Sequence, residues 1–305
     1  MAHGGSKLAI FASMGANLGI AIMKFIASFF TGSSAMLSEG IHSIIDTTNG
    51  ILLLYGIKKA EHPADKQHPF GHGKEIYFWS FVVAIFIFAL GGGVALYEGI
   101  KHLSHHGEVD HSLKMKLWNY GVLIGAIVFE GASLWIGWKE FRKTHPKGIV
   151  KAMEESKDAA SVAVIIENAA AVLGLLIAMI GVSLMYYFDN TIFDAISSII
   201  IGLLLSYMAF FMAKETKHLL IGESATDEDL KEITDILNEY NQIEYFGNIK
   251  TMHMGPNDIM VGANINFNDD LTIAEVEPLI EEIKQRIIKI NPDVKHIYLE
   301  TDSIH

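Results

Sequence analysis

His42 and Asp46 lie four residues apart in the segment SEGIHSIIDTTNG, which long apolar stretches flank on both sides. Four residues are about one turn of a helix, so the two side chains share a face. A neutral imidazole and a carboxylate one turn apart form half of a site for a first-row divalent cation. Ionisable groups inside apolar spans cost roughly 2.5–3.5 kcal/mol each, which makes this pair a functional candidate.

A partner for this half-site must come from another helix, and Glu167 in VAVIIENAAAVLG is the best candidate. The residues around it are small or branched, which lets helices approach closely. Asn168 or Glu39 could supply a further oxygen, Glu39 from the same face as His42. The alternative is structural: His42 and Asp46 would only hydrogen-bond each other, or would bond backbone groups in the bundle core.

Two more ionisable residues, Lys24 and Glu130, fall within apolar runs. They could pair with each other, or Glu130 could serve as a proton relay or a ligand. Asp194 lies near the end of a predicted span, where N-capping of a helix or solvation at the membrane interface is the simpler explanation.

A second cluster of potential ligands lies in EHPADKQHPFGHGKE, which follows the His42 span. Pro and Gly residues predict a shaped turn here instead of a helix. Asp65, His68 and His72 offer one carboxylate and two imidazoles, enough for zinc with water or a fourth ligand. The alternative is a solvated turn in which the histidines have no ligand role.

These candidates lie in a chain of 305 residues that is 50% hydrophobic, with a mean hydropathy of +0.31. Apolar runs of about 20 residues, long enough to cross a bilayer, recur up to about residue 218. They predict six transmembrane helices, near 8–30, 34–57, 76–100, 115–138, 159–187 and 191–213. There is no Cys, so disulfides and thiolate ligands are excluded.

The distribution of basic residues predicts the orientation. If the N-terminus starts in the cytoplasm, the predicted cytoplasmic loops and tails of the helical region hold most of its Lys and Arg, whereas the other face holds only Lys101, Lys114 and Lys116. This asymmetry follows the positive-inside rule and places both termini in the cytoplasm of an integral, multi-pass protein, with the plasma or inner membrane as the expected location.

The remainder, residues 219–305, predicts a small cytoplasmic α+β domain after the transmembrane domain 1–218. Thr226 is the expected N-cap of a first helix. NIKTMHMG and IMVGANINF predict strands on either side of the turn PND, and TIAEVEPLIEEIKQRIIKI predicts an amphipathic helix before the strand VKHIYLET. The whole net charge of −12 belongs to this domain, which argues against nucleic acid as a partner.

HSIID in the second span, PADKQHPFGHGK after it, six spans and a small α+β domain together resemble the cation diffusion facilitator family of divalent-metal/proton antiporters. The most specific part of the resemblance is HPFGHGK. It implies a transport site between the second and fifth helices, where His42 and Asp46 match the second-helix pattern. It also implies a loop site at Asp65, His68 and His72, a ferredoxin- or metallochaperone-like cytoplasmic domain, and a homodimer.

The fifth helix departs from the family pattern of His or Asp followed by x-x-x-Asp. Glu167 falls where the final Asp would be, and Ala163 stands four residues earlier. The site would then have three protein ligands, so Asn168, Glu39 or a water must complete it.

The sequence therefore predicts a non-enzymatic transporter that exports a divalent cation, Zn²⁺ first and Mn²⁺, Fe²⁺ or Co²⁺ as alternatives, in exchange for protons. A membrane metalloenzyme is disfavoured because the chain has no His-Glu-x-x-His helix and no Gly-x-Ser-x-Gly turn. A membrane metal sensor without transport and a passive channel stay open as alternatives.

Overall fold

The computed structural model describes residues 3–104, 109–144 and 159–301. Its contacts divide the chain into two compact units. One contains most of the long helices; the other joins the segment Ile57–Tyr77 to the chain from Lys217 on. Each unit is described by itself.

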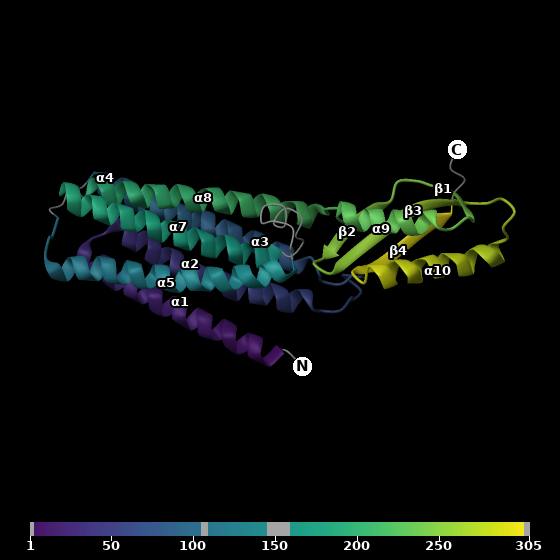
Figure 1. Ribbon diagram of the computed structural model, residues 1–305, viewed down its shortest axis with the longest axis horizontal. Helices are drawn as coiled ribbons and strands as arrows, with labels where there is room; N and C mark the ends of the chain where they lie inside the picture. Colours follow the sequence, from purple (N-terminus) through teal and green to yellow (C-terminus); the bar gives the residue numbers. More distant parts are fainter. Residues whose placement is uncertain (1–2, 105–108, 145–158, 302–305) are drawn as a thin grey trace. The chain divides into compact units, whose positions relative to one another are not determined.

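The long helices follow one another along the chain and are drawn in Figure 1. They are α1 (His3–Thr31), α2 (Ser34–Ala60), α3 (Glu75–Phe86), the π-helical turn η1 (Ile87–Gly92), α4 (Gly93–Leu103), α5 (Leu113–Thr144), α7 (Ala159–Phe188) and α8 (Ile192–Ile221). Helix α5 packs against both α1 and α7.

Four helical stretches are long and apolar enough to cross a membrane: Glu75–Leu103, Leu113–Lys139, Val162–Phe188 and Ile192–Ile221. The sequence predicts six, so the first two differ from expectation within the described residues. Helix α1 supplies only a shorter apolar stretch, Asn17–Thr31. Helix α2 falls short because polar and charged side chains interrupt its apolar residues.

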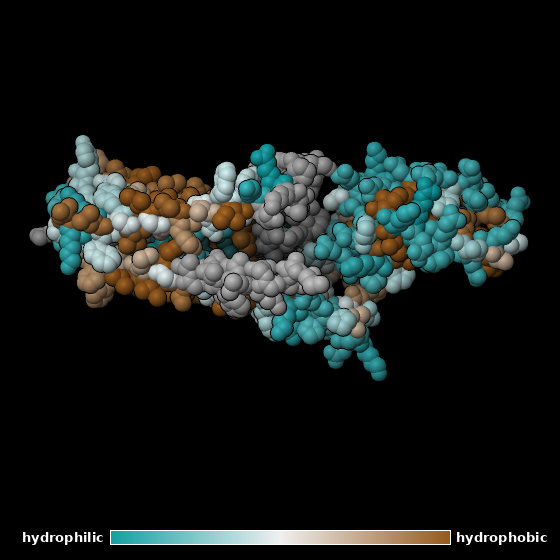
Figure 2. Space-filling view, turned by 60° about the horizontal axis from the view of Figure 1, so that its bottom comes forward, coloured by the Kyte–Doolittle hydropathy of each residue, from teal (hydrophilic) through white to brown (hydrophobic). Residues whose placement is uncertain are grey.

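Apolar side chains cover much of the surface of the helical unit (Figure 2). Trp135, Tyr207 and Phe210 are among those with more than half of their surface exposed, at 67%, 71% and 68%. Large exposed apolar surface of this kind is costly in water and suits contact with lipid. The α+β unit is mostly hydrophilic on the face shown in Figure 2.

Glycines allow α4 and α8 to approach closely. A Cβ on Gly99 would lie 2.6 Å from Cγ1 of Ile199, and one on Gly202 would lie 2.8 Å from the backbone nitrogen of Leu96. Small residues at helix contacts are a common way to pack helices in membranes.

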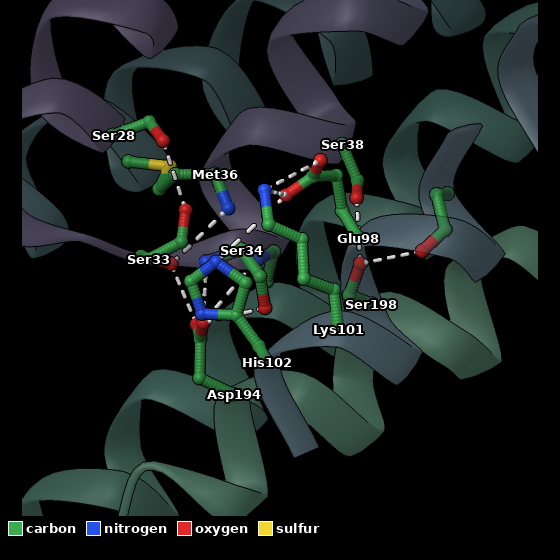
Figure 3. A network of polar contacts seen from close by, with 12 residues as sticks. Ser28, Ser33, Ser34, Met36, Ser38, Glu98, Lys101, His102, Asp194 and Ser198 are labelled. Carbon is green, nitrogen blue, oxygen red and sulfur yellow. Dashed lines mark hydrogen bonds and ion pairs between the residues drawn. The ribbon is translucent and has the colours of Figure 1, made fainter. Parts of the chain in front are cut away.

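The start of α2 is held by a carboxylate from α8 (Figure 3). Asp194 accepts hydrogen bonds from the backbone N–H of Ser34 at 2.6 Å and from that of Ala35 at 3.3 Å, and also from the hydroxyl groups of Ser33 and Ser34. Of the two expected roles of Asp194, the structure shows capping, but the helix that it caps is α2 and not its own. A second link joins the hydroxyl groups of Ser38 and Ser198 at 2.6 Å.

In its described residues, the second unit is built around a four-stranded sheet on which helices pack. Its elements are α9 (Asp227–Asn238), β1 (Ile243–Phe246), β2 (Lys250–Gly255), β3 (Asp258–Phe267), α10 (Ile273–Ile290) and β4 (Val294–Thr301). Strand β3 is central: β1 and β2 pair antiparallel with its two halves, and β4 pairs parallel with it. Side chains of β3 alternate between buried and half-buried, and the buried ones form the core with α9 and α10.

The expected elements of this unit are confirmed. Thr226 caps α9 in a reciprocal capping box with Asp229. Before α10, the carboxylate of Glu275 accepts the backbone N–H and the hydroxyl group of Thr272. Strand β1 was not predicted, because four residues carry too little alternation to be recognised from the sequence.

Candidate metal sites

Four polar side chains follow one face of α2 at spacings of three and four residues. We call them the α2 seam: Glu39, His42, Asp46 and Asn49. Glu39 and Asn49 are fully buried, His42 is 1% exposed, and the side chain of Asp46 is 11% exposed. Nδ1 of His42 lies 3.3 Å from Oδ1 of Asp46, as the spacing predicts.

Glu167 of α7 faces this seam. Its side chain is buried, and its Oε1 accepts a hydrogen bond of 2.7 Å from the amide nitrogen of Asn49. The structure thus brings Glu167 to α2 through Asn49, a residue that the sequence reasoning did not single out. Ala163, one turn before Glu167, is buried and offers no ligand.

Several polar side-chain atoms of the seam are buried without a hydrogen-bond partner. They are both ring nitrogens of His42, Oδ1 of Asp46, Oδ1 of Asn49 and Oε1 of Glu39. Burying such groups without a partner costs free energy that a bound cation would recover. The donor set of an imidazole, carboxylates and an amide also fits a first-row divalent cation.

Lys24 of α1 is fully buried, and its ammonium group is directed to the seam. Its Nζ lies 3.2 Å from Oε2 of Glu39 and 2.7 Å from the hydroxyl oxygen of Ser43. Lys24 therefore pairs with Glu39. Among the described residues no direct ion pair joins Lys24 to Glu130, and a relay or ligand role of Glu130 stays a prediction. Ser43 and Glu39 lie one turn apart on α2, so both reach the same ammonium group. Glu130 is buried on α5.

The two residues expected to complete the site have other surroundings. Glu39 forms an ion pair with Lys24 through its Oε2. Asn168 is half-buried, and its Nδ2 is the nearest atom to a Cβ built on Gly137 of α5, at 3.9 Å. Asn168 therefore approaches α5, whereas the side chain facing Glu167 from α2 is Asn49.

The second cluster lies in the segment between α2 and α3, which we call the loop cluster: Asp65, His68 and His72. Among the described residues, these three form the one group of potential metal ligands whose ligand atoms all lie within 4.8 Å of one another, and the described residues of the α2 seam and α7 form no such group. Oδ2 of Asp65 lies 3.2 Å from Nε2 of His72, and Oδ1 lies 3.5 Å from Nδ1 of His68. The cluster thus has the geometry that its sequence predicts.

Local backbone hydrogen bonds hold the side chain of Asp65 in place within the loop cluster. Oδ1 of Asp65 accepts the backbone N–H groups of His68 and Gln67, each at 2.7 Å, and Gly71 has a positive φ of 85° that suits glycine. The backbone N–H of His68, with that of Gln67 and the side chain of His72, lowers the pKa of Asp65 to about 2. The carboxylate is therefore ionised and available to a cation at neutral pH.

The same segment packs on the sheet of its own unit. The rings of Phe70 and His296 meet edge to face at 5.3 Å. Gly73 lies so close to the β2–β3 turn that an added Cβ would overlap the backbone oxygen of Met254 and lie 3.1 Å from Cα of Gly255. The loop cluster is thus built into the α+β unit.

Comparisons with known proteins agree with this arrangement. Residues 10–221 match the cation efflux transmembrane domain, and residues 225–303 match the cytoplasmic domain of cation efflux proteins. The chain is 29% identical to the mouse proton-coupled zinc antiporter SLC30A9, mitochondrial, over 91% of its own length. It covers 55% of that relative, so it spans about half the length of the first curated relatives it matches.

Other relatives are covered more fully. The cation-efflux pump FieF of Citrobacter koseri is 24% identical over 94% of this chain and 89% of its own length. The Arabidopsis metal tolerance protein C4 is 29% identical over 88% of this chain and 58% of its own. With its membrane-spanning helices followed by an α+β domain, the chain belongs to the cation efflux family of transporters.

Proposed function

We propose that the protein exports Zn²⁺ in exchange for protons, with the cation bound between α2 and α7 by His42, Asp46 and Glu167. The observation that carries this proposal is the set of buried acceptors without partners on the α2 seam, faced by the carboxylate of Glu167. The similarity to the mouse relative, which is a proton-coupled zinc antiporter, supports both the ion and the exchange mode.

Proton exchange follows from the chemistry of the ligands. Imidazole and carboxylate groups bind a metal only when they are free of protons, so loading of the cation displaces protons and unloading allows them to return. A buried site strengthens this competition, because an uncompensated charge there is costly. An inward proton gradient would then favour release of metal outside the cell.

The loop cluster is proposed as a second Zn²⁺ site, one that binds without transporting. Asp65, His68 and His72 supply three ligands, and exposure leaves room for water as the fourth. Its packing on the sheet supports a structural or regulatory role in the α+β unit.

The finer organisation is also proposed. Six spans would include α1 and α2, with both termini in the cytoplasm of a plasma or inner membrane, and the chain would divide into domains 1–218 and 219–305. The match of residues 225–303 to the cytoplasmic domain of cation efflux proteins supports a homodimer. Transport of Mn²⁺, Fe²⁺ or Co²⁺ is the second candidate, since mixed His and carboxylate sites accept several first-row ions.

Flux into proteoliposomes with an imposed pH gradient tests the function directly. Zn²⁺ and Mn²⁺ are compared for the wild type and for Asp46→Ala. We expect Zn²⁺ flux that follows the gradient and falls at least tenfold in the variant. Asp235→Ala removes an exposed carboxylate of α9 and is the matched control, with unchanged flux expected.

Two outcomes would contradict the proposal. Flux that persists in Asp46→Ala would mean that the transport site does not lie on α2. Binding of Zn²⁺ without flux of any ion, in wild-type vesicles that hold the gradient, would favour a membrane metal sensor.

A further inference from the structure

Asn49 differs from the other seam residues because its side chain already joins the two helices of the site. It is fully buried, and it lies three residues after Asp46 and seven after His42, on the same face of α2. Its Nδ2 donates to Oε1 of Glu167 at 2.7 Å, while its Oδ1 is buried without a hydrogen-bond partner.

The orientation of this amide follows from its partner. An amide oxygen in the place of Nδ2 would lie 2.7 Å from a carboxylate oxygen, which would set two acceptors against each other. The nitrogen therefore faces Glu167, and the oxygen is the end left to bind something else. A buried amide oxygen without a partner loses the free energy of its hydrogen bond to water.

An unpartnered amide oxygen alone is not enough, because Asn119 on α5 shows the same feature. Asn119 is also fully buried, and its Nδ2 donates to the phenolic oxygen of Tyr186 at 2.9 Å, while its Oδ1 has no partner. The two residues differ in their neighbours. Asn119 bonds a tyrosine, whereas Asn49 bonds the carboxylate of Glu167 and shares its helix face with one imidazole and two further carboxylates, those of the α2 seam.

We propose that Asn49 is a binding residue of the transport site, which holds Glu167 through its amide nitrogen and offers its amide oxygen to the divalent cation. This inference rests on the proposed function. The proposal accounts for the ligand that is missing at Ala163. The amide oxygen of Asn49 on α2 would take the place of the ligand that α7 lacks there. A neutral oxygen adds a ligand without adding charge, and carbonyl oxygens suit Mn²⁺ better than softer donors do.

The test compares Asn49→Leu, of similar shape but without polar atoms, with Asn119→Leu as the matched control. Zn²⁺ and Mn²⁺ binding to the purified full chain is measured by titration calorimetry in detergent, and proton-driven flux is measured in proteoliposomes. To isolate the transport site, both Asn49→Leu and Asn119→Leu are made in a protein that also carries His68→Ala and His72→Ala in the loop cluster, and that double variant is their reference. For Asn49→Leu we expect at least tenfold weaker binding and a raised KM for both ions, whereas Asn119→Leu leaves binding unchanged.

Asn49→Asp keeps an oxygen donor and is expected to retain binding within about tenfold of the wild type while changing the ratio of Zn²⁺ to Mn²⁺ affinity. Wild-type binding and KM in Asn49→Leu would overturn the inference. So would a lower kcat and melting temperature with an unchanged KM, since that result assigns Asn49 a structural role. Failure of the proposed function has a different signature, namely wild-type flux in Asp46→Ala.

Discussion

The ligand atoms of the two candidate metal sites differ in their burial and in their hydrogen-bond partners. In the loop cluster, Asp65 is exposed, its oxygens are bound by backbone N–H groups and imidazoles, and the three ligands already lie within 4.8 Å of one another. In the α2 seam the donors are buried, several lack partners, and Glu167 reaches the seam through Asn49. The loop cluster is therefore preorganised, whereas the buried site has donors that a cation would have to gather.

This contrast suits two different tasks. A preorganised, solvated cluster exchanges ions with little change of structure, as a resident or sensing site requires. A buried site whose donors are incompletely satisfied binds a cation strongly only when its helices close around it, so binding can be coupled to a change in helix packing. Lys24 supplies a fixed positive charge to Glu39 beside the site and so limits the negative charge that the cation meets.

The largest effect is expected when the buried site loses its imidazole. His42→Ala removes the nitrogen donor of the seam, and we expect proton-driven Zn²⁺ flux to fall by about a hundredfold, or about 2.7 kcal/mol. The double variant His68→Ala/His72→Ala in the loop cluster should keep flux within about threefold, because the proposed function assigns the transported ion to the α2 seam and not to the loop cluster.

Calorimetry separates the two sites in the same variants. The wild type should bind two Zn²⁺ ions per chain, and each variant should lose a different one. Equal loss of flux in both variants would show that the two clusters form one pathway and would remove the distinction between them.

Much of the loop cluster could be predicted from the sequence, and less of the buried site. Asp65, His68 and His72 are close in sequence, and prolines and glycines fix the turn, so local geometry decides their meeting. Glu167 and α2 meet only through tertiary packing, which no local pattern specifies. Asn49 was missed because a lone Asn in DTTNG looks like an ordinary polar residue of a helix surface. The signal that could have found it is its position three residues after Asp46, which continues the spacing of Glu39, His42 and Asp46.

The same reasoning explains the outcomes elsewhere in the fold. The helices of the α+β unit were predicted because apolar residues recur at helical spacing in both, and because Thr226 stands where the first needs a cap. The partner of Lys24 could not be predicted, because the choice between Glu39 and Glu130 depends on which helix lies against α1 at that depth.

A smaller effect is expected when the loop is forced away from its sheet. Gly73→Ala places a methyl group against the backbone of Met254, and backbone atoms yield less readily than side chains. We expect the α+β unit to lose about 1–3 kcal/mol of stability. Hydrogen exchange of the β2–β3 turn in the full chain measures this loss, while metal binding by the α2 seam should not change.

Gly262→Ala is the matched control, because a Cβ there meets only the backbone oxygen of Lys250 at 3.9 Å. Faster exchange in both variants would trace the effect to glycine replacement in general and not to the packing of the loop.

The smallest effect is expected from Asp65→Asn, and its pH dependence distinguishes the roles within the loop cluster. The pKa of Asp65 is lowered to about 2, so its folded-state stabilisation is present above the ordinary carboxyl range and is lost only as the pH falls toward 2. Between pH 8 and 4 the carboxylate stays ionised, and any fall in Zn²⁺ affinity must come from the imidazoles, which bind metal only when neutral. Asp65→Asn should therefore weaken loop binding by roughly tenfold, about 1.4 kcal/mol, at every pH in this range without changing the shape of the profile.

Calorimetry in the His42→Ala background, where the loop cluster is the remaining site, measures this profile. A profile that flattens in Asp65→Asn would mean that the carboxylate itself titrates there, and the loop cluster would then resemble the buried site in how its donors compete with protons.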